Sequence, residues 1–320
     1  MVPHIDRPRT RFFLTLAGRV AEGLLTAWVA VTLTFFALRI AIGDPVASLL
    51  SQGLATVEQA QRLRAALGLD QSLITQYTRF LVNLVKGDLG LSLYTSQPVE
   101  QIIFRQLPST AALAFSGLAL GVLFGFLLGT LAAWKRAQWS GQIASSIAGL
   151  STSVPVAFIG IVALLAVSAL ANSDLEGWEI WGYSGLLLPA LVLGLTTAGP
   201  IGKVIEAGLL ESMQSPYFQA AIARGYQRDL RLLWHALRPA LPPVVSLSAL
   251  EAAYLFSGTV ITETVFSRPG LGRLLLRSIL EGDFPIAQGL VVMAAIFYTA
   301  SHLGADILAM LLDPRLREST

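Results

Sequence analysis

The sequence contains no cysteine, and only 13% of its 320 residues are charged, against about 25% in an ordinary soluble domain. Without cysteine, disulfide bonds, thiolate metal sites and a cysteine nucleophile are all excluded. The shortage of charge leaves too few polar side chains to cover a soluble protein of this length. Hydrophobic residues make up 54% of the chain, so the composition predicts an integral membrane protein.

The apolar residues are gathered into long uncharged intervals. Each interval exceeds the roughly 20 residues that a helix needs to cross about 30 Å of hydrocarbon. The intervals lie between Arg105 and Lys135, Arg136 and Asp174, Glu179 and Lys203, and Asp283 and Asp306. Because backbone polar groups in lipid must be satisfied within the segment, these intervals are expected to be helices.

We therefore predict an all-α membrane protein with six transmembrane helices. The predicted spans are 19–42, 107–134, 142–171, 185–207, 239–262 and 285–312. Lysine and arginine are more frequent in the segments on the same side as the N-terminus, so both termini are expected to be cytoplasmic. The chain then divides into an N-terminal cytoplasmic segment (1–18), the first transmembrane helix (19–42), an ordered extracytoplasmic helical loop (43–106), a five-helix core (107–312) and a cytoplasmic tail (313–320).

The long loop between the first two spans carries helix signals. Thr56 and Gln59 have the spacing of a capping box, and Gly68 is placed to end that helix. A second helix is predicted from about Ser72 to Lys86. The pair is interpreted either as a docking surface for an outside partner or as helices that lie on the membrane surface, and the sequence leaves both open.

Motifs for enzymatic chemistry are absent. A phosphate-binding loop needs G-x-x-x-x-G-K-[ST], and Lys86, Lys135 and Lys203, the three lysines, lie in no such setting. HExxH and G-x-S-x-G do not occur either. We therefore expect no catalytic site, no metal site and no bound cofactor in this chain. The net charge of +2, spread over the loops, argues against nucleic acid as a partner.

A segment at 208–238, between the fourth and fifth spans, differs from a simple connector. Ser215 suits the N-cap, Pro216 the first helical position and Gly225 the left-handed position past the helix end. The pattern predicts a helix of about two turns, a glycine turn and a second helix that ends near Pro239. Small and aromatic side chains on the first helix suit close contact with a cytoplasmic partner.

This segment resembles the EAA loop of bacterial ABC-importer permeases, in the form found in the dipeptide, oligopeptide and nickel family. The similarity rests on Gln219-Ala-Ala221, Gly225 and the run His235-Ala-Leu-Arg238. The resemblance implies that this loop binds the ATPases of the transporter. The residues it points to are Tyr217, Phe218, Ala220, Ala221, Arg224, Gly225, His235 and Leu237.

Further motifs in the same order extend the resemblance over nearly the whole chain. They are Leu67-Gly-Leu-Asp70, Lys86-Gly-Asp-Leu-Gly90, Leu107-Pro-Ser-Thr110, Glu263-Thr-Val-Phe-Ser-Arg-Pro-Gly-Leu-Gly272, Asp283-Phe-Pro-Ile-Ala-Gln-Gly289 and Leu312-Asp-Pro-Arg315. The fourth motif is expected to form part of the outer mouth, near the docking site of a binding protein. The residues concerned are Glu263, Arg268, Pro269, Gly270 and Gly272.

The resemblance implies the type I importer permease fold in a bacterial or archaeal inner membrane. The implied partners are a second, homologous permease in a heterodimer, two cytoplasmic ATPases that bind ATP and Mg, an extracytoplasmic substrate-binding protein and membrane lipid. The implied cargo is peptides, related small solutes, or nickel and other metal chelates. The alternative is a secondary transporter or channel without ATPases; a secondary transporter would need internal repeats, and none is detected.

Charged residues inside the predicted spans have a functional and a structural interpretation. Glu251 either lines the pathway or makes an interhelical contact. His302 and Asp306 lie on one helical face, as a proton relay or cation site, or as a hydrogen-bonded pair. Small residues at every fourth position predict close helix–helix contact rather than a ligand site. They are Gly117, Gly121, Gly125 and Gly129.

Overall fold

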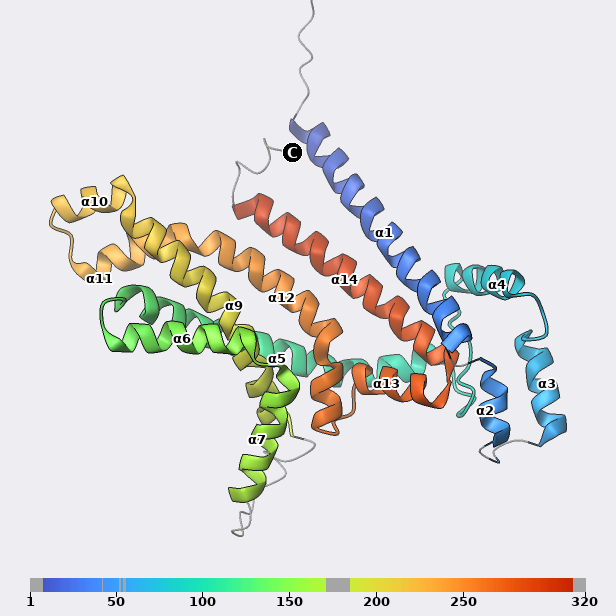
Figure 1. The fold of residues 1–320 in the computed structure, drawn as a ribbon. Coiled ribbons are helices and arrows are strands. Elements are labelled where there is room, and N and C mark those ends of the chain that lie inside the picture. Colours follow the sequence, from blue (N-terminus) through green and yellow to red (C-terminus); the bar gives the residue numbers. More distant parts are fainter. Residues whose placement is uncertain (1–7, 42, 52, 54–55, 171–184, 313–320) are drawn as a thin grey trace, which may run out of the picture. The chain divides into compact units, whose positions relative to one another are not determined.

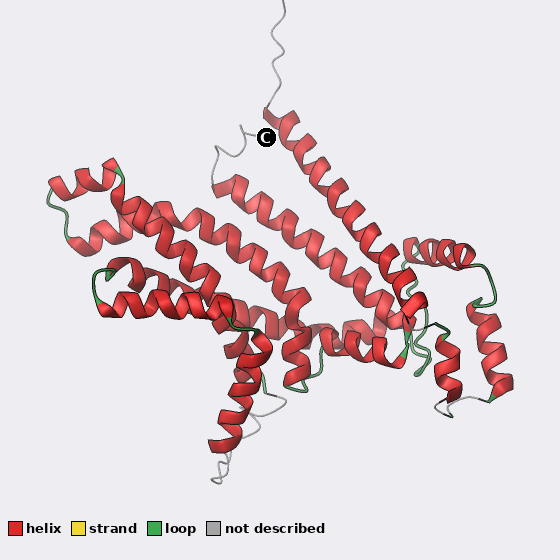
Figure 2. Cartoon of the chain, viewed as in Figure 1, coloured by secondary structure: helices red, strands yellow, loops and turns green. Residues whose placement is uncertain are grey.

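The computed structural model describes residues 8–41, 43–51, 53, 56–170 and 185–312. These residues form helices and connecting loops, with no β-strand among them (Figure 1, Figure 2). The chain divides into two compact units. The first unit comprises the described parts of 1–20, 111–268 and 300–320, and the second comprises those of 21–110 and 269–299.

Helices occupy all six predicted spans. Four of the described helices are long and apolar enough to cross a membrane, and a bent pair supplies a fifth span if its two halves are counted together. The four are α1 (Pro8–Ala41), α5 (Val99–Trp134), α9 (Leu187–Gln214) and α14 (Phe284–Leu312), and the bent pair is α6 (Trp139–Ser153) with α7 (Val156–Leu170). The remaining predicted span, 239–262, lies within α12 (Arg238–Val265), a helix of 28 residues.

The third predicted span, 142–171, is not one straight helix. The chain bends by 108° between α6 and α7, at Val154 and Pro155. Proline has no N–H and disfavours the helical conformation in the residue before it, and Val154 is accordingly extended (φ −91°, ψ 126°). The break leaves backbone carbonyls without helical partners, which is tolerated in a membrane protein only where protein or a cavity surrounds them.

The first helix is longer than predicted. α1 begins at Pro8 and runs for 34 residues, so it includes much of the segment assigned to a cytoplasmic leader (1–18). Proline at a first helical position has its φ already set and needs no N–H partner, which explains the early start. Residues 1–7, together with the predicted tail at 313–320, lie outside the described residues.

In the first unit, α5 packs closely on α9 along its glycine stripe. A Cβ at Gly117, Gly121 or Gly125 would come within 2.9 Å of Leu193, Thr197 or Ile201. A Cβ at Gly129 would come within 2.3 Å of the Gly202 carbonyl oxygen. The glycines therefore let the two backbones approach, and the predicted helix–helix contact is confirmed.

In the second unit, the loop between α1 and α5 forms short helices. α2 (Pro45–Ser51) is followed by α3 (Val57–Leu67), which carries the predicted Thr56–Gln59 capping box and ends at left-handed Gly68. α4 (Leu73–Val85) begins at the N-cap Ser72. Its Tyr77 hydroxyl lies 2.6 Å from the Thr32 hydroxyl, and its ring packs edge-on against Phe35 of α1. These contacts fix α4 against α1, and the helix prediction is confirmed.

Candidate coupling surface and cavity

The predicted two-turn helix in the 208–238 segment is α10 (Pro216–Ala223). It ends in the predicted left-handed turn, because Gly225 has φ +72° and the N–H of Tyr226 donates to the Ala221 carbonyl at 3.3 Å. The predicted N-cap bond does not form. The Ser215 hydroxyl donates instead to the Ser212 carbonyl near the end of α9, 2.5 Å away, and the Ser215 N–H donates to the same carbonyl at 3.2 Å.

The eight residues expected to contact an ATPase fall into two groups. Four are exposed to solvent, namely Tyr217, Ala220, Arg224 and Gly225. The other four, Phe218, Ala221, His235 and Leu237, are buried or half-buried. The first group can touch a partner directly, whereas Ala221 is buried and the other three are only partly accessible.

Sequence reasoning missed several exposed apolar residues beside this group. Ile222 and Tyr226 are 43% and 46% exposed, and Leu233 and Trp234 are 54% and 63% exposed. The sequence carries a signal for them, because large apolar side chains in an exposed connecting segment are unfavourable in water and mark a contact surface. We call Tyr217, Ile222, Tyr226, Leu233 and Trp234 the apolar strip.

The second helix of the segment does not end near Pro239, so that prediction is wrong. α11 (Arg228–Leu230) passes into a π-helix, η1 (Arg231–Leu237), and the chain continues without a break into α12. Pro239 is the second residue of α12, directly after η1. The wider π turn changes the register just before it, so the helix passes through the proline.

α10 and η1 are packed onto both neighbouring spans of the first unit. η1 contacts α9, α12 and α10. One hydrophobic cluster joins them through Leu209 of α9, Leu232 and Ala236 of η1 and Val244 of α12, with Phe218 of α10 packed against it. In Figure 1 the pair lies at one end of α9 and α12. α10 is therefore joined to these two helices through closely packed contacts.

A cavity of about 570 Å³ lies deeper in the same unit. The described residues that line it include Ser151–Val156 at the α6–α7 corner, Thr196, Thr197 and Pro200 of α9, and Glu251 and Tyr254 of α12. We call it the α6–α9–α12 cavity. Glu251, which the sequence left open between a pathway residue and an interhelical contact, lies in its wall.

Two residues of the predicted outer mouth lie at the C-terminal end of α12 or just beyond it. Glu263 is fully buried, Arg268 is 9% exposed, and the Arg268 N–H donates to the Glu263 carbonyl at 2.8 Å. Burial lowers the pKa of the Arg268 guanidinium, and the Glu263 charge opposes that shift. A buried Glu263 side chain cannot touch a docking protein in this conformation, so any contact falls to its neighbours.

The other outer-mouth residues, in the second unit, start the helix α13 (Leu271–Glu281). The Ser109 hydroxyl donates to the Pro269 carbonyl, and the Leu271 N–H donates to the Thr110 hydroxyl at 2.8 Å. Gly270 accepts from the Leu274 N–H at 3.0 Å, and Gly272 is buried in the first turn of α13. The turn thus ties α13 to α5 at Ser109 and Thr110.

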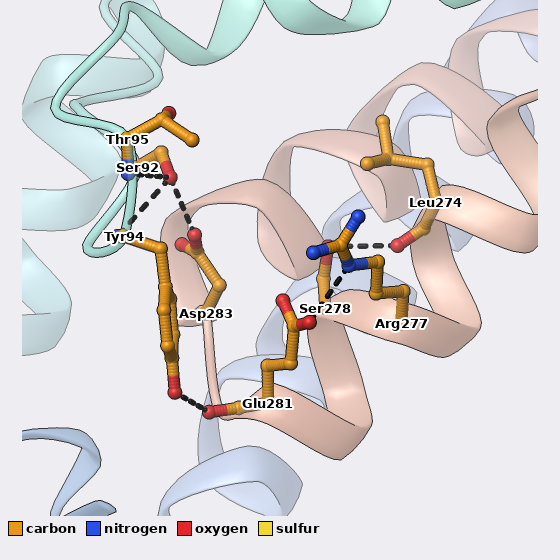
Figure 3. A network of polar contacts seen from close by, with 8 residues as sticks. All are labelled: Ser92, Tyr94, Thr95, Leu274, Arg277, Ser278, Glu281 and Asp283. Atoms are coloured by element: carbon orange, nitrogen blue, oxygen red, sulfur yellow. Dashed lines mark hydrogen bonds and ion pairs between the residues drawn. The ribbon is translucent and has the colours of Figure 1, made fainter. Parts of the chain in front are cut away.

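A polar network, shown in Figure 3, holds the 88–98 loop of the second unit to the junction of α13 and α14. The Ser92 hydroxyl donates to one oxygen of Asp283 at 2.6 Å, and the Leu93 N–H donates to the other at 3.3 Å. Tyr94 donates to the Glu281 carbonyl. Burial raises the pKa of Asp283, although hydrogen bonds, the one from Ser92 first, oppose the shift.

Among the described residues, no group of three or more histidine, aspartate or glutamate side chains could hold a metal ion. The His302 and Asp306 pair is not decided, because the Asp306 side chain lies outside the described part of the chain. The second unit has a separate, smaller cavity of about 150 Å³ beside Arg39, Gln76 and Phe80.

Comparison with known families covers both halves of the chain. Residues 121–318 match the model of the binding-protein-dependent transport system inner membrane component. Residues 11–114 match the N-terminal model of the same membrane components.

Two relatives are similar over most of their length. A putative peptide transport system permease protein of Brucella abortus (strain 2308) is 34% identical over 311 residues, with 93% of this chain and 97% of the relative covered. The nickel import system permease protein NikB of Staphylococcus aureus (strain USA300) is 33% identical over 301 residues, with 93% and 90% covered.

Solved structures share the fold at lower identity. An inward-facing MetNI methionine ABC transporter matches with a TM-score of 0.56 and 18% identity, over 68% of this chain and all of that chain. An amino acid ABC transporter with histidines matches with a TM-score of 0.52 and 15% identity, over 68% and 94%. On the family matches and the full-length relatives, the chain belongs to the family of binding-protein-dependent transport system inner membrane components, the permeases of ABC importers.

Proposed function

We propose that this inner-membrane permease imports peptides or related small solutes and is driven through α10 and η1 by separate cytoplasmic ATPases. The peptide cargo is supported by the relative named as a peptide transport permease. Nickel is the second candidate, because the similarly close NikB is named for nickel import.

The observation that carries the proposal is the apolar strip on α10, the turn after it and η1. It leaves large apolar side chains in solvent on a helix pair that is packed directly onto α9 and α12. Exposed apolar side chains gathered on one element mark a protein contact. The strip therefore supports a partner that binds α10 and moves α9 and α12, the two helices packed against it.

The proposed assembly follows from the family. A second, homologous permease completes the pathway, two ATPases bind ATP and Mg, and an extracytoplasmic binding protein delivers the solute. This chain supplies no catalytic group. Closure of the ATPases on ATP would shift the population from inward-open toward outward-open arrangements of the helices.

The outer-mouth role is part of the same proposal. Pro269, Gly270 and Gly272 begin α13, and Arg268 ends the segment after α12. Residues at these positions would shape the entrance beneath the binding protein, with Glu263 acting as a buried support. In this arrangement the 1–18 and 313–320 segments face the cytoplasm, as α10 does.

The test is Ile222→Glu, alone and with Tyr217→Glu, in the whole transporter expressed with its partners. We expect the ATPases to be lost from the purified complex by at least about tenfold, because a buried, unpaired charge strongly weakens an interface. ATP-dependent uptake should fall in parallel.

The matched control is Val57→Glu, which places the same charge at another exposed apolar position, 65% exposed, in the first turn of α3. It should leave both readouts unchanged. ATPases that copurify equally with Ile222→Glu would contradict the proposed contact.

A further inference from the structure

We propose that the α6–α9–α12 cavity binds the protonated amino group of the transported solute, with Glu251 as its counter-charge. The inference deepens the proposed function and rests on it, because it assigns a charge class to the solute. It is argued from the charge, the hydrogen-bond polarity and the backbone of the cavity wall.

Glu251 is the only charged side chain among the described residues that line the cavity. Within the described part of the chain, no hydrogen bond or ion pair engages its carboxylate, although the side chain is half-buried in the middle of α12. Charges at such positions are expensive, and those that persist in membrane helices face partners or pathways. The wall therefore presents one uncompensated negative charge.

Five of the six hydroxyl groups that line the cavity point their protons away from it, and the sixth belongs to Tyr254. Ser151, Thr152 and Ser153 donate to the carbonyls of Ala148 or Gly149 at 2.6–3.1 Å. Thr196 and Thr197 donate to the Leu193 carbonyl at 2.8 and 2.9 Å. A hydroxyl has one proton and two acceptor lone pairs. With the proton already used within the helix, each of these groups can offer the cavity only an acceptor.

The backbone of the wall adds more acceptors. α6 ends at Ser153, and the C-terminal end of a helix carries unpaired carbonyls and a partial negative charge. Pro155 has no N–H to return to the Ser151 carbonyl, and Pro200 has none for the Thr196 carbonyl. Broken membrane helices use such carbonyls and C-terminal ends to hold cations.

Hydrogen-bond donors are fewer in the same wall, and the Tyr254 hydroxyl is one group there that can donate. The N-terminus of α7 also lies at the corner, but two of its first N–H groups, those of Phe158 and Ile159, donate to the Pro155 carbonyl. No lysine, arginine or histidine occurs among the described lining residues. The balance of the wall is therefore acceptor-rich and negative.

An ammonium group fits this wall better than the other candidates. It carries a positive charge and three donors with no acceptor, which complements a carboxylate surrounded by acceptors. A carboxylate ligand would meet like charge. A bare nickel ion would find one carboxylate and weak hydroxyl ligands, and tight sites for such ions use imidazole or thiolate groups.

The absence of cysteine from the chain allows a direct test of the charge. Ser153→Cys puts a near-isosteric thiol in the cavity wall, in the assembled transporter in membrane vesicles. Its rates of reaction with a cationic and an anionic methanethiosulfonate reagent are compared by mass spectrometry of this chain. We expect the cationic reagent to be favoured, and Glu251→Gln to lower that preference by about tenfold, the scale of one unpaired charge at close range in a protein.

Two controls keep the test specific. Glu251→Asp should retain the preference, because the charge remains. With Thr78→Cys, an exposed position on α4 outside the cavity, Glu251→Gln should change nothing. An unchanged ratio at Ser153→Cys on removing the Glu251 charge, or faster reaction of the anionic reagent, would overturn the inference.

Uptake separates this inference from the proposed function. In cells that lack other peptide permeases, Glu251→Gln should reduce uptake of labelled alanyl-lysine by about tenfold more than uptake of alanyl-glutamate. Alanyl-lysine carries two ammonium groups and loses their attraction to Glu251, whereas alanyl-glutamate carries one and is also freed from repulsion of its extra carboxylate. The Glu58→Gln control, on α3, should alter neither. Equal losses for both dipeptides would overturn the role of Glu251. A wild-type transporter that imports no dipeptide but keeps the reagent preference would contradict only the peptide cargo.

Discussion

The apolar strip, on α10, the turn after it and η1, exposes its side chains, whereas the polar network around Asp283 buries that carboxylate and pairs it. On the strip, Ile222, Tyr226 and Trp234 stay in solvent although the hydrophobic effect favours their burial. In the network, Asp283 is 2% exposed and receives bonds from Ser92 and Leu93 of a loop 190 residues away in sequence. In the proposed function the first region is covered by an ATPase, whereas the second is completed by its own chain.

The two regions suit different roles: the apolar strip suits contact with a moving partner, and the Asp283 network suits support of the fold. A surface that binds a partner must be supported by packing on one side and exposed on the other. The cluster of Leu209, Leu232 and Val244 provides that packing. A corner whose polar groups are paired within the chain resists opening, because opening breaks the hydrogen bonds that Ser92 and Leu93 donate to Asp283. Substitutions in the two regions should therefore give different failures.

The largest effect is expected at the turn that ends α10. Gly225→Val forces a β-branched residue into φ +72°, which costs about 1–2 kcal/mol or more and displaces the turn. A Cβ there meets nothing within 4 Å, so membrane insertion should be normal. Uptake should fall by at least about tenfold while ATP hydrolysis continues.

The control for this turn is Gly225→Asn, since asparagine tolerates the left-handed conformation better than other residues. It should keep most of the uptake. Normal transport by purified complexes carrying Gly225→Val would refute the role of the turn.

A smaller effect, of the opposite kind, is expected at the network. Asp283→Ala leaves the Ser92 hydroxyl and the Leu93 N–H without their acceptor and should destabilise the corner by about 2–3 kcal/mol. Hydrogen exchange of the 88–98 segment should speed up by about tenfold or more. Copurification of the ATPases should not change. Loss of the ATPases with unaltered hydrogen exchange would contradict the expectation that the network supports the fold and takes no part in binding the ATPases.

The smallest effect is the pH dependence of the same corner. Burial raises the pKa of Asp283 in the folded protein above the 3.8 of an unperturbed aspartate. Stability from this group is therefore fully present below 3.8 and is lost as pH rises through the folded pKa. Acidification from neutral pH should slow the opening of the 88–98 segment, after correction for the intrinsic exchange rate.

Asp283→Asn tests that sign. The amide keeps an acceptor for Ser92 or Leu93 but does not ionise, so the pH dependence should disappear while the fold is kept. A pH dependence that persists in Asp283→Asn would assign it to another group.

Much of the local structure could be predicted from short-range signals. The Thr56–Gln59 capping box, the ends at Gly68 and Gly225, and the glycine stripe that meets α9 all depend on residues within a few positions or on one helical face. Such features follow from backbone sterics and helical spacing. The continuation of α12 through Pro239 could not be predicted, because it depends on a π turn that packing against α9 and α12 supports.

The candidate site was predicted only in part. The motif around Gly225 indicated the coupling loop, but exposure alone separates Tyr217, which can touch a partner, from Ala221, which cannot. Glu251 was recognised as a charge in a span. The hydroxyls that share its cavity come from α6 and α9, and no sequence spacing joins them to it.

The sequence by itself determined a cysteine-free, helical membrane chain with no catalytic motif, and it predicted a coupling segment, because length, composition and spacing act locally along the chain. Only the tertiary structure decided that the third span breaks at Pro155, that Asp283 meets Ser92, and that Glu251 lies among acceptor groups. Those features depend on which helices pack together, and packing brings together residues that are far apart in sequence.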